Sequence, residues 1–340
     1  MELTMRAVAF RRYGPADVLE SLVLPRPSVR PDSILIRVAA AAVNPADWRL
    51  RDGQFRLAMR LRFPFIPGSD VAGIVESVGP AVSRFQPGDA VYAMIPTMMG
   101  GGYAEYVAVS EQYVALAPRH LSLGNTAGVP LAALTALQGL RDRARLQAGQ
   151  QVLVYGASGG VGSFAVQIAK AMGASVTAAT SSRNAVLVQN LGADTVIDYT
   201  QHSFSEAAQR FDLIFDAVNV LSFRHILPSL NPYGVFVTVN PFIEKLSPGW
   251  LASFRRGKRL RSVFVQPGGA DLDCLSRWLD VDQIRPLIDQ RYPLTDAAEA
   301  HRYSATGRVR GKLVLIVNKQ LAEIVVAQST LPIEETSVSL

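Results

Sequence analysis

A glycine-rich turn in the middle of the chain has the residue types and spacing of a phosphate-binding loop. Residues 151–155 form an apolar, β-branched run typical of a buried parallel strand, and residues 163–170 predict a helix. The turn between them reads Ala157-x-Gly159-x-x-Gly162, with alanine where the first glycine is usual. Such glycines let backbone N–H groups approach a pyrophosphate, and the helix N-terminus adds a partial positive charge. We therefore expect a dinucleotide cofactor to bind at Ser158, Gly159, Gly160, Val161 and Gly162.

The residues after the second strand of this unit bear on the choice between NAD and NADP. An acidic residue about 20 positions after the glycine turn usually binds the ribose 2′-OH in NAD enzymes. Here that segment is Thr180-Ser181-Ser182-Arg183-Asn184, which contains no carboxylate. The Ser181 hydroxyl and the Arg183 guanidinium suit a 2′-phosphate, which needs donors and positive charge. NADPH is the expected cofactor, and the alternative is that Arg183 is a solvated residue at a helix start.

The elements that must position this turn change character along the chain. The first 120 residues predict an all-β unit with strands at 3–10, 33–42, 69–78, 90–95 and 103–109, separated by Gly/Pro turns. Strands then alternate with helices, which is typical of a doubly wound parallel sheet: helices 131–141 and 184–191, strands 175–180, 195–197, 213–216, 235–239 and 263–265. The last segments, helices 272–279 and 295–304 and strands 288–292 and 312–317, are too short for another domain. We expect them to return to the first unit, which divides the chain into 1–123, 124–265, 266–318 and a tail, 319–340, that begins as a weak helix.

Composition and charge exclude several classes of protein. The 340 residues are 49% hydrophobic and 18% charged, which fits a globular chain long enough for two cores. The net charge is +6, but the basic residues are spread out, and the densest run, at 255–261, is more typical of a solvated helix end than of a phosphate site. We expect no nucleic-acid partner. No apolar segment reaches the roughly 18 residues that cross a membrane, and the N-terminus lacks a signal-peptide core, so the expected location is cytoplasmic.

Cysteine and histidine usage argues against a metal site. Cys274 is the only cysteine, and His120, His202, His225 and His301 are scattered without metal-ligand spacing. An intrachain disulfide and a Cys₄ zinc site are therefore excluded, and a catalytic zinc of the Cys/His type is not expected.

Several segments, taken together, resemble the medium-chain dehydrogenase/reductase superfamily, in its zinc-independent quinone reductase and enal reductase branch. They run in family order over roughly residues 5–317: Val43-Asn44-Pro45-Ala46-Asp47-Trp48, Pro67-Gly68-Ser69-Asp70-Val71-Ala72-Gly73, Phe85-Gln86-Pro87-Gly88-Asp89-Ala90-Val91, Gly101-Gly102-Tyr103-Ala104-Glu105-Tyr106, the glycine turn, Leu191-Gly192-Ala193-Asp194 and Arg310-Gly311-Lys312-Leu313. The resemblance implies an α/β fold in which a Rossmann doubly wound parallel sheet is inserted in a GroES-like β domain. It also implies an active site between the two domains and a homodimer.

The departures from the zinc-dependent alcohol dehydrogenases concern the metal ligands. Asn44 stands where those enzymes have a cysteine ligand, and Gly68-Ser69-Asp70 replaces their Gly-His-Glu segment. Oxidation of a hydroxyl that needs Zn²⁺ as a Lewis acid would lose its electrophile here. Reduction of a conjugated C=C needs no metal, because hydride goes to the β carbon and negative charge moves to the carbonyl oxygen.

The resemblance also suggests individual site residues. It places Tyr199 against the adenosine phosphate and Thr135 near the nicotinamide, with Val218, Asn240, Val265, Arg310 and Lys312 near the cofactor. Alternatives remain for two of them: Tyr199 is a packing residue at a strand end, or Thr135 bonds only its own helical turn.

Substrate-side candidates are fewer. Asn44 would bond the nicotinamide ribose or the substrate carbonyl, or it merely forms an Asn-Pro turn. Asp47 is more typical of a helix cap than of an acid. Tyr103 follows three glycines and is a candidate proton donor, although such a tyrosine is more often a packed strand residue.

Two functions of different classes fit these patterns. The first is an NADPH-dependent reductase of quinones or of the conjugated C=C of α,β-unsaturated carbonyls, such as enones and enals. The second is a non-catalytic NADPH-binding sensor or scaffold of the same fold.

Overall fold

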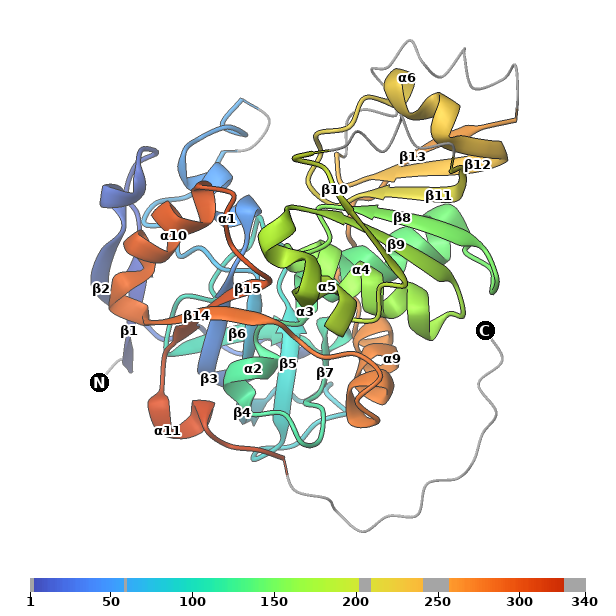
Figure 1. The fold of residues 1–340 in the computed structure, drawn as a ribbon. Helices are drawn as coiled ribbons and strands as arrows, with labels where there is room; N and C mark the ends of the chain where they lie inside the picture. Colours follow the sequence, from blue (N-terminus) through green and yellow to red (C-terminus); the bar gives the residue numbers. More distant parts are fainter. Residues whose placement is uncertain (1–2, 58–59, 202–208, 241–256, 327–340) are drawn as a thin grey trace.

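The computed structural model describes residues 3–57, 60–201, 209–240 and 257–326. Two large sheets organise them, one from the middle of the chain and one from both ends (Figure 1). The basic run at 255–261 lies partly outside these residues, and the predicted tail lies outside them after residue 326. No helix in the described ranges is long and apolar enough to cross a membrane.

The sheet of the middle segment is six-stranded and parallel in all its strand pairs. Its order is β10-β9-β8-β11-β12-β13, built from β8 (Gln151–Tyr155), β9 (Ser175–Thr180), β10 (Thr195–Asp198), β11 (Phe211–Asp216), β12 (Leu230–Thr238) and β13 (Arg259–Ser262). The chain moves outward from β8 to β10 and then returns to β11 on the other side of β8. This reversal is a topological switch point, where doubly wound sheets bind ligands at the carboxyl ends of their strands.

Helices cover both faces of this sheet because alternate strand residues point to opposite faces. Val152 and Val154 of β8 share one apolar cluster with Phe164 of α4 (Gly160–Ala171). Leu153, between them, belongs to a different cluster with Phe223 of α6 (Phe223–Ile226). Figure 1 shows α4 and α6 on opposite sides of the strands, with α5 (Ala185–Asn190) after β9.

The second sheet combines strands from both ends of the chain. Its path is β14-β15-β3-β4-β5-β7, with β6 pairing to β3: β3 (Ser33–Val43), β4 (Asp70–Val78), β5 (Ala90–Met94), β6 (Tyr106–Ser110), β7 (Val114–Leu116), β14 (Ile288–Pro293) and β15 (Lys312–Ile316). Late strand β15 pairs antiparallel with early strand β3, Leu313 opposite Val43. Strands β1 (Thr4–Ala9) and β2 (Glu20–Pro25) form a separate hairpin.

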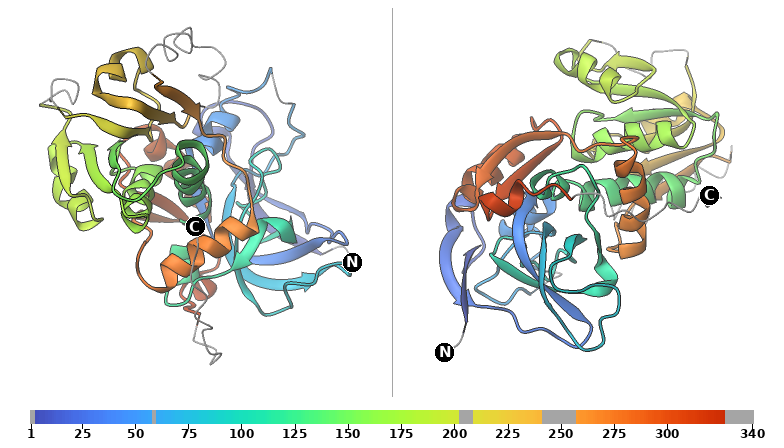
Figure 2. Two further views of the ribbon diagram at one scale, coloured as in Figure 1. Left: turned by 90° about the vertical axis from the view of Figure 1, so that its right-hand side faces the viewer. Right: turned by 90° about the horizontal axis from the view of Figure 1, so that it is seen from below.

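Helices tie the two sheets together. Helix α9 (Gly269–Asp280), orange in Figure 2, lies against the second sheet, and Tyr92 donates its hydroxyl hydrogen to the Leu272 carbonyl at 2.7 Å. Helix α3 (Pro130–Gln138), which precedes β8, packs with α4 in the larger apolar cluster. The remaining helices of interest are α1 (Pro45–Arg51), α2 (Leu123–Thr126), α10 (Ala297–Ala305) and α11 (Lys319–Ala322).

Some predicted elements differ from the structure. The strand expected at 263–265 lies earlier, at β13, because the partner strand β12 ends opposite Ser262; the apolar run just after it was the misleading signal. Tyr103 precedes strand β6 rather than lying in it. Strands β2 and β7 and helix α1 were not predicted as elements; β2 has mostly exposed residues, and β7 is only three residues long.

Candidate active site

The glycine turn has the geometry that a bound pyrophosphate requires. Gly156 follows β8 with φ +76°, a conformation that favours glycine. A Cβ on Gly162 would lie 2.1 Å from the Gly156 carbonyl oxygen, so the first turn of α4 can approach the strand end only with glycine there. Gly159 is the N-cap residue of α4, and a Cβ on it would meet only the Gly156 oxygen, at 3.4 Å. The space above Gly159 is therefore open at a helix N-terminus, which fits a pyrophosphate group.

A cluster of hydroxyl and amide groups lies beside this turn, at the ends of β8 and β9. Ser158 Oγ accepts hydrogen bonds from Thr180 Oγ1 and from Asn184 Nδ2, each at 3.0 Å. Its own hydroxyl hydrogen is then available to a ligand. Asn184 also reaches Ser181 Oγ at 3.3 Å, while its buried Oδ1 has no hydrogen-bond partner among the described residues. Asn184 and Thr180 are site candidates that the sequence pattern did not single out.

The charges around this cluster have opposite signs. Arg183 is exposed and makes no ion pair with any residue that the structure describes. Asp198, at the end of β10, lies opposite Thr180 in the sheet register and accepts hydrogen bonds from Thr200, which lower its pKa. Tyr199 stacks on Tyr155 with ring centroids 5.3 Å apart and is 42% exposed. Residues 180–184 contain no carboxylate, but strand pairing brings the carboxylate of Asp198, 18 residues after Thr180, next to them.

Four strand ends meet at the edge of the sheet that carries the turn. Tyr155, Asp216, Thr238 and Ser262 stand in one row of the parallel register. The predicted cofactor residues Val218, Asn240 and Val265 follow two or three residues after this row, so the structure brings them to the same edge as the turn.

Val218 is held over the turn by a buried carboxylate. Asp216 accepts hydrogen bonds from the backbone N–H groups of Val218 at 3.1 Å and of Leu221 at 2.9 Å. Burial raises the pKa of Asp216, and these donors oppose that rise. Val218 itself is 44% exposed, and its Cγ1 lies where it would contact a Cβ on Gly156.

The glycine turn contacts a buried ion pair of the second sheet. Gly311 N donates to the Ser158 carbonyl at 2.8 Å, and a Cβ on Gly160 would lie 3.1 Å from Lys312 Cδ. Lys312 Nζ donates to Asn44 Oδ1 and, at 3.2 Å, to Asp70 Oδ2. Asn44 Nδ2 donates to the same Asp70 oxygen at 3.0 Å. The side chains of Lys312 and Asp70 are only 4% and 0% exposed, so this is a fully desolvated pair.

A second group of buried polar residues adjoins the first through Asp47. Asp47 Oδ2 accepts from Asn44 N at 2.8 Å, which caps α1, and from the Tyr103 hydroxyl at 3.3 Å. The Tyr103 oxygen lies 3.0 Å from His301 Nε2, and His301 Nδ1 lies 3.0 Å from Arg51 Nη1. We call Asn44, Asp47, Arg51, Asp70, Tyr103, His301 and Lys312 the buried polar cluster.

The directions of the hydrogen bonds in this chain follow from Arg51. A guanidinium only donates, so His301 Nδ1 must be the acceptor, and the ring hydrogen is on Nε2. His301 therefore donates to the Tyr103 oxygen, and Tyr103 donates to Asp47. Burial, together with the Arg51 charge, lowers the pKa of His301 to about 3, so the imidazole is neutral at pH 7.

Burial also sets the protonation of the acids. It raises the pKa of Asp47 to about 7, against the opposing effect of the Asn44 N–H, and it raises the pKa of Asp70 against the Lys312 ammonium. The pKa of Tyr103 is raised well above its usual value, first by burial and then by Asp47.

The two predicted catalytic residues are therefore placed differently from what the sequence suggested. Asn44 is 1% exposed, and its amide orients Lys312 and Asp70 rather than facing solvent. Tyr103 is 0% exposed, and its hydroxyl hydrogen is bonded to Asp47 rather than directed to solvent. Thr135 Oγ1 donates to the Leu131 carbonyl of its own helix at 2.7 Å, and Arg310 is exposed with its N–H bonded to Asp289. Sequence reasoning missed His301, Arg51 and Asp70 as parts of one network.

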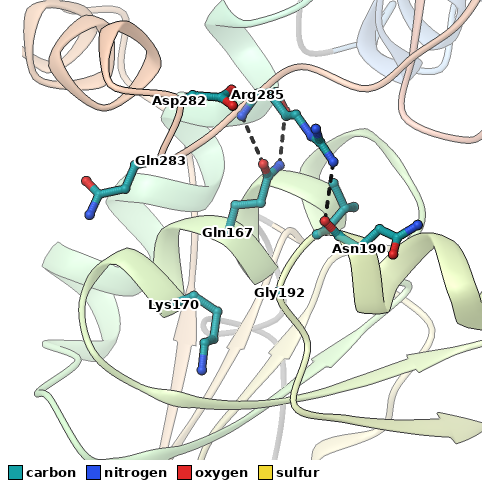
Figure 3. Close-up of a pocket in the computed structure, with 8 residues that line it drawn as sticks. Gln167, Lys170, Asn190, Gly192, Asp282, Gln283 and Arg285 are labelled. Atoms are coloured by element: carbon teal, nitrogen blue, oxygen red, sulfur yellow. Dashed lines mark hydrogen bonds between the residues drawn. The ribbon is translucent and has the colours of Figure 1, made fainter.

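A polar hollow on the outer side of the parallel sheet is separate from this site. It has a volume of about 320 Å³ and is lined by residues such as Gln167, Lys170, Asn190 and Arg285 (Figure 3). Gln167 exchanges two hydrogen bonds with the Arg285 backbone, at 2.9 and 3.0 Å, and Arg285 Nη2 bonds the Asn190 carbonyl. These bonds fasten the segment before β14 to α4, so we assign the hollow a structural role. Among the residues described, no group of three or more His, Cys, Asp or Glu could hold a metal ion.

A parallel sheet with a glycine turn at its switch point, joined to a sheet built from both chain ends, is typical of two-domain nucleotide-binding oxidoreductases. Family comparisons agree: residues 30–119 match the alcohol dehydrogenase GroES-like domain, and residues 191–315 match a family described as zinc-binding dehydrogenase. The chain is 34% identical to the chloroplastic quinone-oxidoreductase QR1 of Triphysaria versicolor, covering 92% of this chain and 98% of that protein. It is 36% identical to the chloroplastic NADPH-dependent alkenal/one oxidoreductase of Arabidopsis thaliana, covering 92% and 79%.

Solved structures show the same relationship. The quinone oxidoreductase of Coxiella burnetii superposes with a TM-score of 0.84 at 30% identity, covering 93% of this chain and 100% of that one. The chain belongs to the medium-chain dehydrogenase/reductase superfamily, in its branch of quinone and alkenal/one oxidoreductases. The predicted fold class, a Rossmann sheet combined with a GroES-like domain, is confirmed.

Proposed function

We propose that this chain is an NADPH-dependent, zinc-independent reductase of quinones and of the conjugated C=C of α,β-unsaturated carbonyls. Relatives named quinone oxidoreductase and alkenal/one oxidoreductase support the substrate class. The observation that carries the proposal is the contact of the glycine turn with Gly311 and Lys312. It joins an open pyrophosphate site to a buried ammonium.

The residues of the chain have distinct tasks in this reaction. NADPH, when bound, supplies the hydride. The turn at Gly159 would hold its pyrophosphate, and Ser158, Ser181 and Arg183 would hold the 2′-phosphate with donors and positive charge. Val218, Asn240 and Val265 would line the edge along which the cofactor lies, with Tyr199 at its adenosine end.

The Lys312 ammonium would stabilise the negative charge that develops on the substrate oxygen. An ammonium has three N–H donors, and Asn44 and Asp70 accept two hydrogen bonds from Lys312. A positive group that is already oriented lowers the barrier where charge develops, because no reorganisation is needed. An isolated ketone, which would concentrate its charge on one oxygen, is expected to be a far poorer substrate.

We further infer a homodimer, as the family resemblance implies. Strand β13 is at the edge of the six-stranded sheet among the described strands, and Phe264 beyond it is 71% exposed. A strand edge without a partner can pair with another chain, and the exposed Phe264 next to it offers apolar contact area. The cytoplasmic location expected from the sequence stays a prediction; the two plant relatives named above are described as chloroplastic.

An isotope experiment tests the reaction. With NADPH deuterated at C4 and a small enone, we expect the saturated ketone with deuterium at the β carbon, at an unchanged rate in a metal chelator. Asn44→Ala should slow turnover, because it releases both Lys312 and Asp70. An allylic alcohol labelled at the carbonyl carbon would mean 1,2-reduction and contradict the mechanism. If neither enones nor quinones consume NADPH, the chain is a binding protein without turnover.

A further inference from the structure

A line of hydroxyl groups connects buried Asp47 with the protein surface. Ser69 Oγ lies 3.5 Å from Asp47 Oδ1 and 3.0 Å from Thr97 Oγ1. Ser69 is 0% exposed, whereas Thr97 is partly exposed and precedes Met98 and Met99, whose exposed fractions are 57% and 54%. Ser69 also adjoins Asp70, whose carboxylate accepts from Lys312 beside the glycine turn. The line thus begins next to the proposed site and ends at a partly exposed hydroxyl beside two exposed methionines.

The hydrogens along this line have one self-consistent arrangement. Asp47 Oδ2 is already occupied as an acceptor by Asn44 N and Tyr103. Ser69 has a single hydroxyl hydrogen for two neighbours. If Ser69 donates to Thr97, its contact with Asp47 Oδ1 needs a hydrogen from the carboxyl group, which must then be protonated. If Asp47 is ionised, Ser69 turns and donates to it.

We propose that Asp47 is the proton reservoir of the reaction, and that it delivers its proton through Ser69 and Thr97 to the α carbon of the reduced enone. The proposal rests on the proposed function and adds its proton source. Hydride addition leaves an enolate, whose α carbon takes a hydrogen from Thr97 Oγ1. Thr97 takes one from Ser69, and Ser69 takes one from the Asp47 carboxyl group. Asp47, now a carboxylate, regains a proton from solvent by the same path after product release.

The surroundings of Asp47 poise it for this role. Three neighbours favour the ionised form of Asp47: the Asn44 N–H at the start of α1, the Tyr103 hydroxyl before β6, and the Lys312 ammonium on β15. Burial and the nearby Asp70 of β4 favour the protonated form and outweigh the donors, which raises the pKa of Asp47 to about 7. On α10, neutral His301 contributes no charge, and Arg51 fixes its ring orientation. A carboxyl group with a pKa near the working pH both gives and regains a proton efficiently.

The pH dependence follows from the protonated form being the active one. The kcat for an enone should be constant below about pH 7 and fall as pH rises through Asp47's pKa. Quinone reduction should not show this fall, because hydroquinone oxygens take protons from water. Tyr103→Phe removes a donor to the carboxylate, so it should move the enone inflection to higher pH. A purely structural role for Tyr103 would lower activity without moving the inflection.

The decisive variant is Thr97→Val, which removes a hydroxyl from a partly exposed site at nearly constant volume. We expect it to lower kcat for an α-substituted enone at least tenfold, with KM and the quinone rate unchanged. In D₂O, the wild type should place deuterium on one face of the α carbon, and Thr97→Val on both. Thr306→Val, whose hydroxyl only bonds the Tyr303 carbonyl and Arg308 N at the end of α10, is the matched control and should change neither.

Asp47→Asn keeps an acceptor for the cap but cannot supply a carboxyl proton, and it should abolish the pH inflection. Equal losses with enone and quinone in Thr97→Val, or retained one-face deuteration, would overturn the relay and leave the reductase intact. If the wild-type protein oxidises no NADPH with either an enone or a quinone, the proposed reductase function is wrong, and the relay is wrong with it.

Discussion

The glycine turn and the buried polar cluster touch at Gly311 and Lys312, yet they are built by opposite means. The turn consists of consecutive residues, and its groups for a ligand are backbone N–H donors around an open space above Gly159. The cluster takes side chains from α1, β4, β15, α10 and the segment before β6, and it places ionisable groups where water does not reach.

This difference determines what each region costs the fold. The first backbone N–H groups of any helix have no partner within the helix. Using them to bind a ligand therefore leaves the stability of the fold almost unchanged. Buried charges lose their hydration and are tolerated only with well-placed partners. Substitutions in the turn should therefore affect binding most, and substitutions in the cluster should affect stability most.

The largest expected effect is on the buried ion pair. Asp70→Asn leaves the Lys312 ammonium without its carboxylate and should lower the free energy of unfolding by about 3–5 kcal/mol, measured by urea denaturation. Asp273→Asn, which breaks the exposed pair with Arg84, is the matched control and should cost less than about 1 kcal/mol.

A double variant tests the cause. Asp70→Asn with Lys312→Met removes both charges and should recover at least half of the loss, since an apolar replacement of a buried pair is often neutral. A double variant as unstable as the sum of the single ones would show that the cluster stabilises through packing and not through charge.

The same contrast explains which parts of the site the sequence could predict. Gly159 and Gly162 were recognised because a turn between a strand and a helix is local, and its geometry demands glycine at fixed spacing. The two domain types followed from the alternation of strands with helices and from family motifs. Boundaries were less predictable where burial alternates, as in β13, whose charged Arg259 and Arg261 hide a strand.

The cluster was beyond sequence reasoning because its members are distant in the chain. His301 and Arg51 are 250 residues apart, and no sequence motif near either residue indicates that they are in contact. Asp70 was visible only as part of a family motif, and its link to Lys312 depends on β15 pairing with β3. Asp198 shows the same limit, since only the pairing of β10 with β9 brings its carboxylate beside Thr180.

The next effect concerns binding alone. Gly159→Ala adds a Cβ at ordinary contact distance from the protein but inside the space expected for the pyrophosphate. We expect unfolding to change by less than about 1 kcal/mol and NADPH affinity to fall about a hundredfold, or roughly 2.7 kcal/mol, by fluorescence titration. Gly268→Ala, with nothing near its Cβ, should change neither, whereas Gly162→Ala should also destabilise the fold. If Gly159→Ala binds NADPH as tightly as the wild type, the glycine turn does not bind the cofactor.

The smallest effect is the most discriminating, because two charges at one strand end pull in opposite directions. NADPH should bind at least about tenfold better than NADH, as a charge-assisted contact to the 2′-phosphate contributes roughly 1.5–3 kcal/mol. Arg183→Ala should remove most of this preference and leave NADH affinity nearly unchanged. Asp198→Asn should increase the preference by roughly threefold, since it removes a negative charge beside Thr180 at a solvent-screened position. Titrations of both cofactors against both variants decide the assignment. Equal weakening of NADPH and NADH by Arg183→Ala would mean that Arg183 supports the start of α5, and the 2′-phosphate would then depend on Ser158 and Ser181 alone.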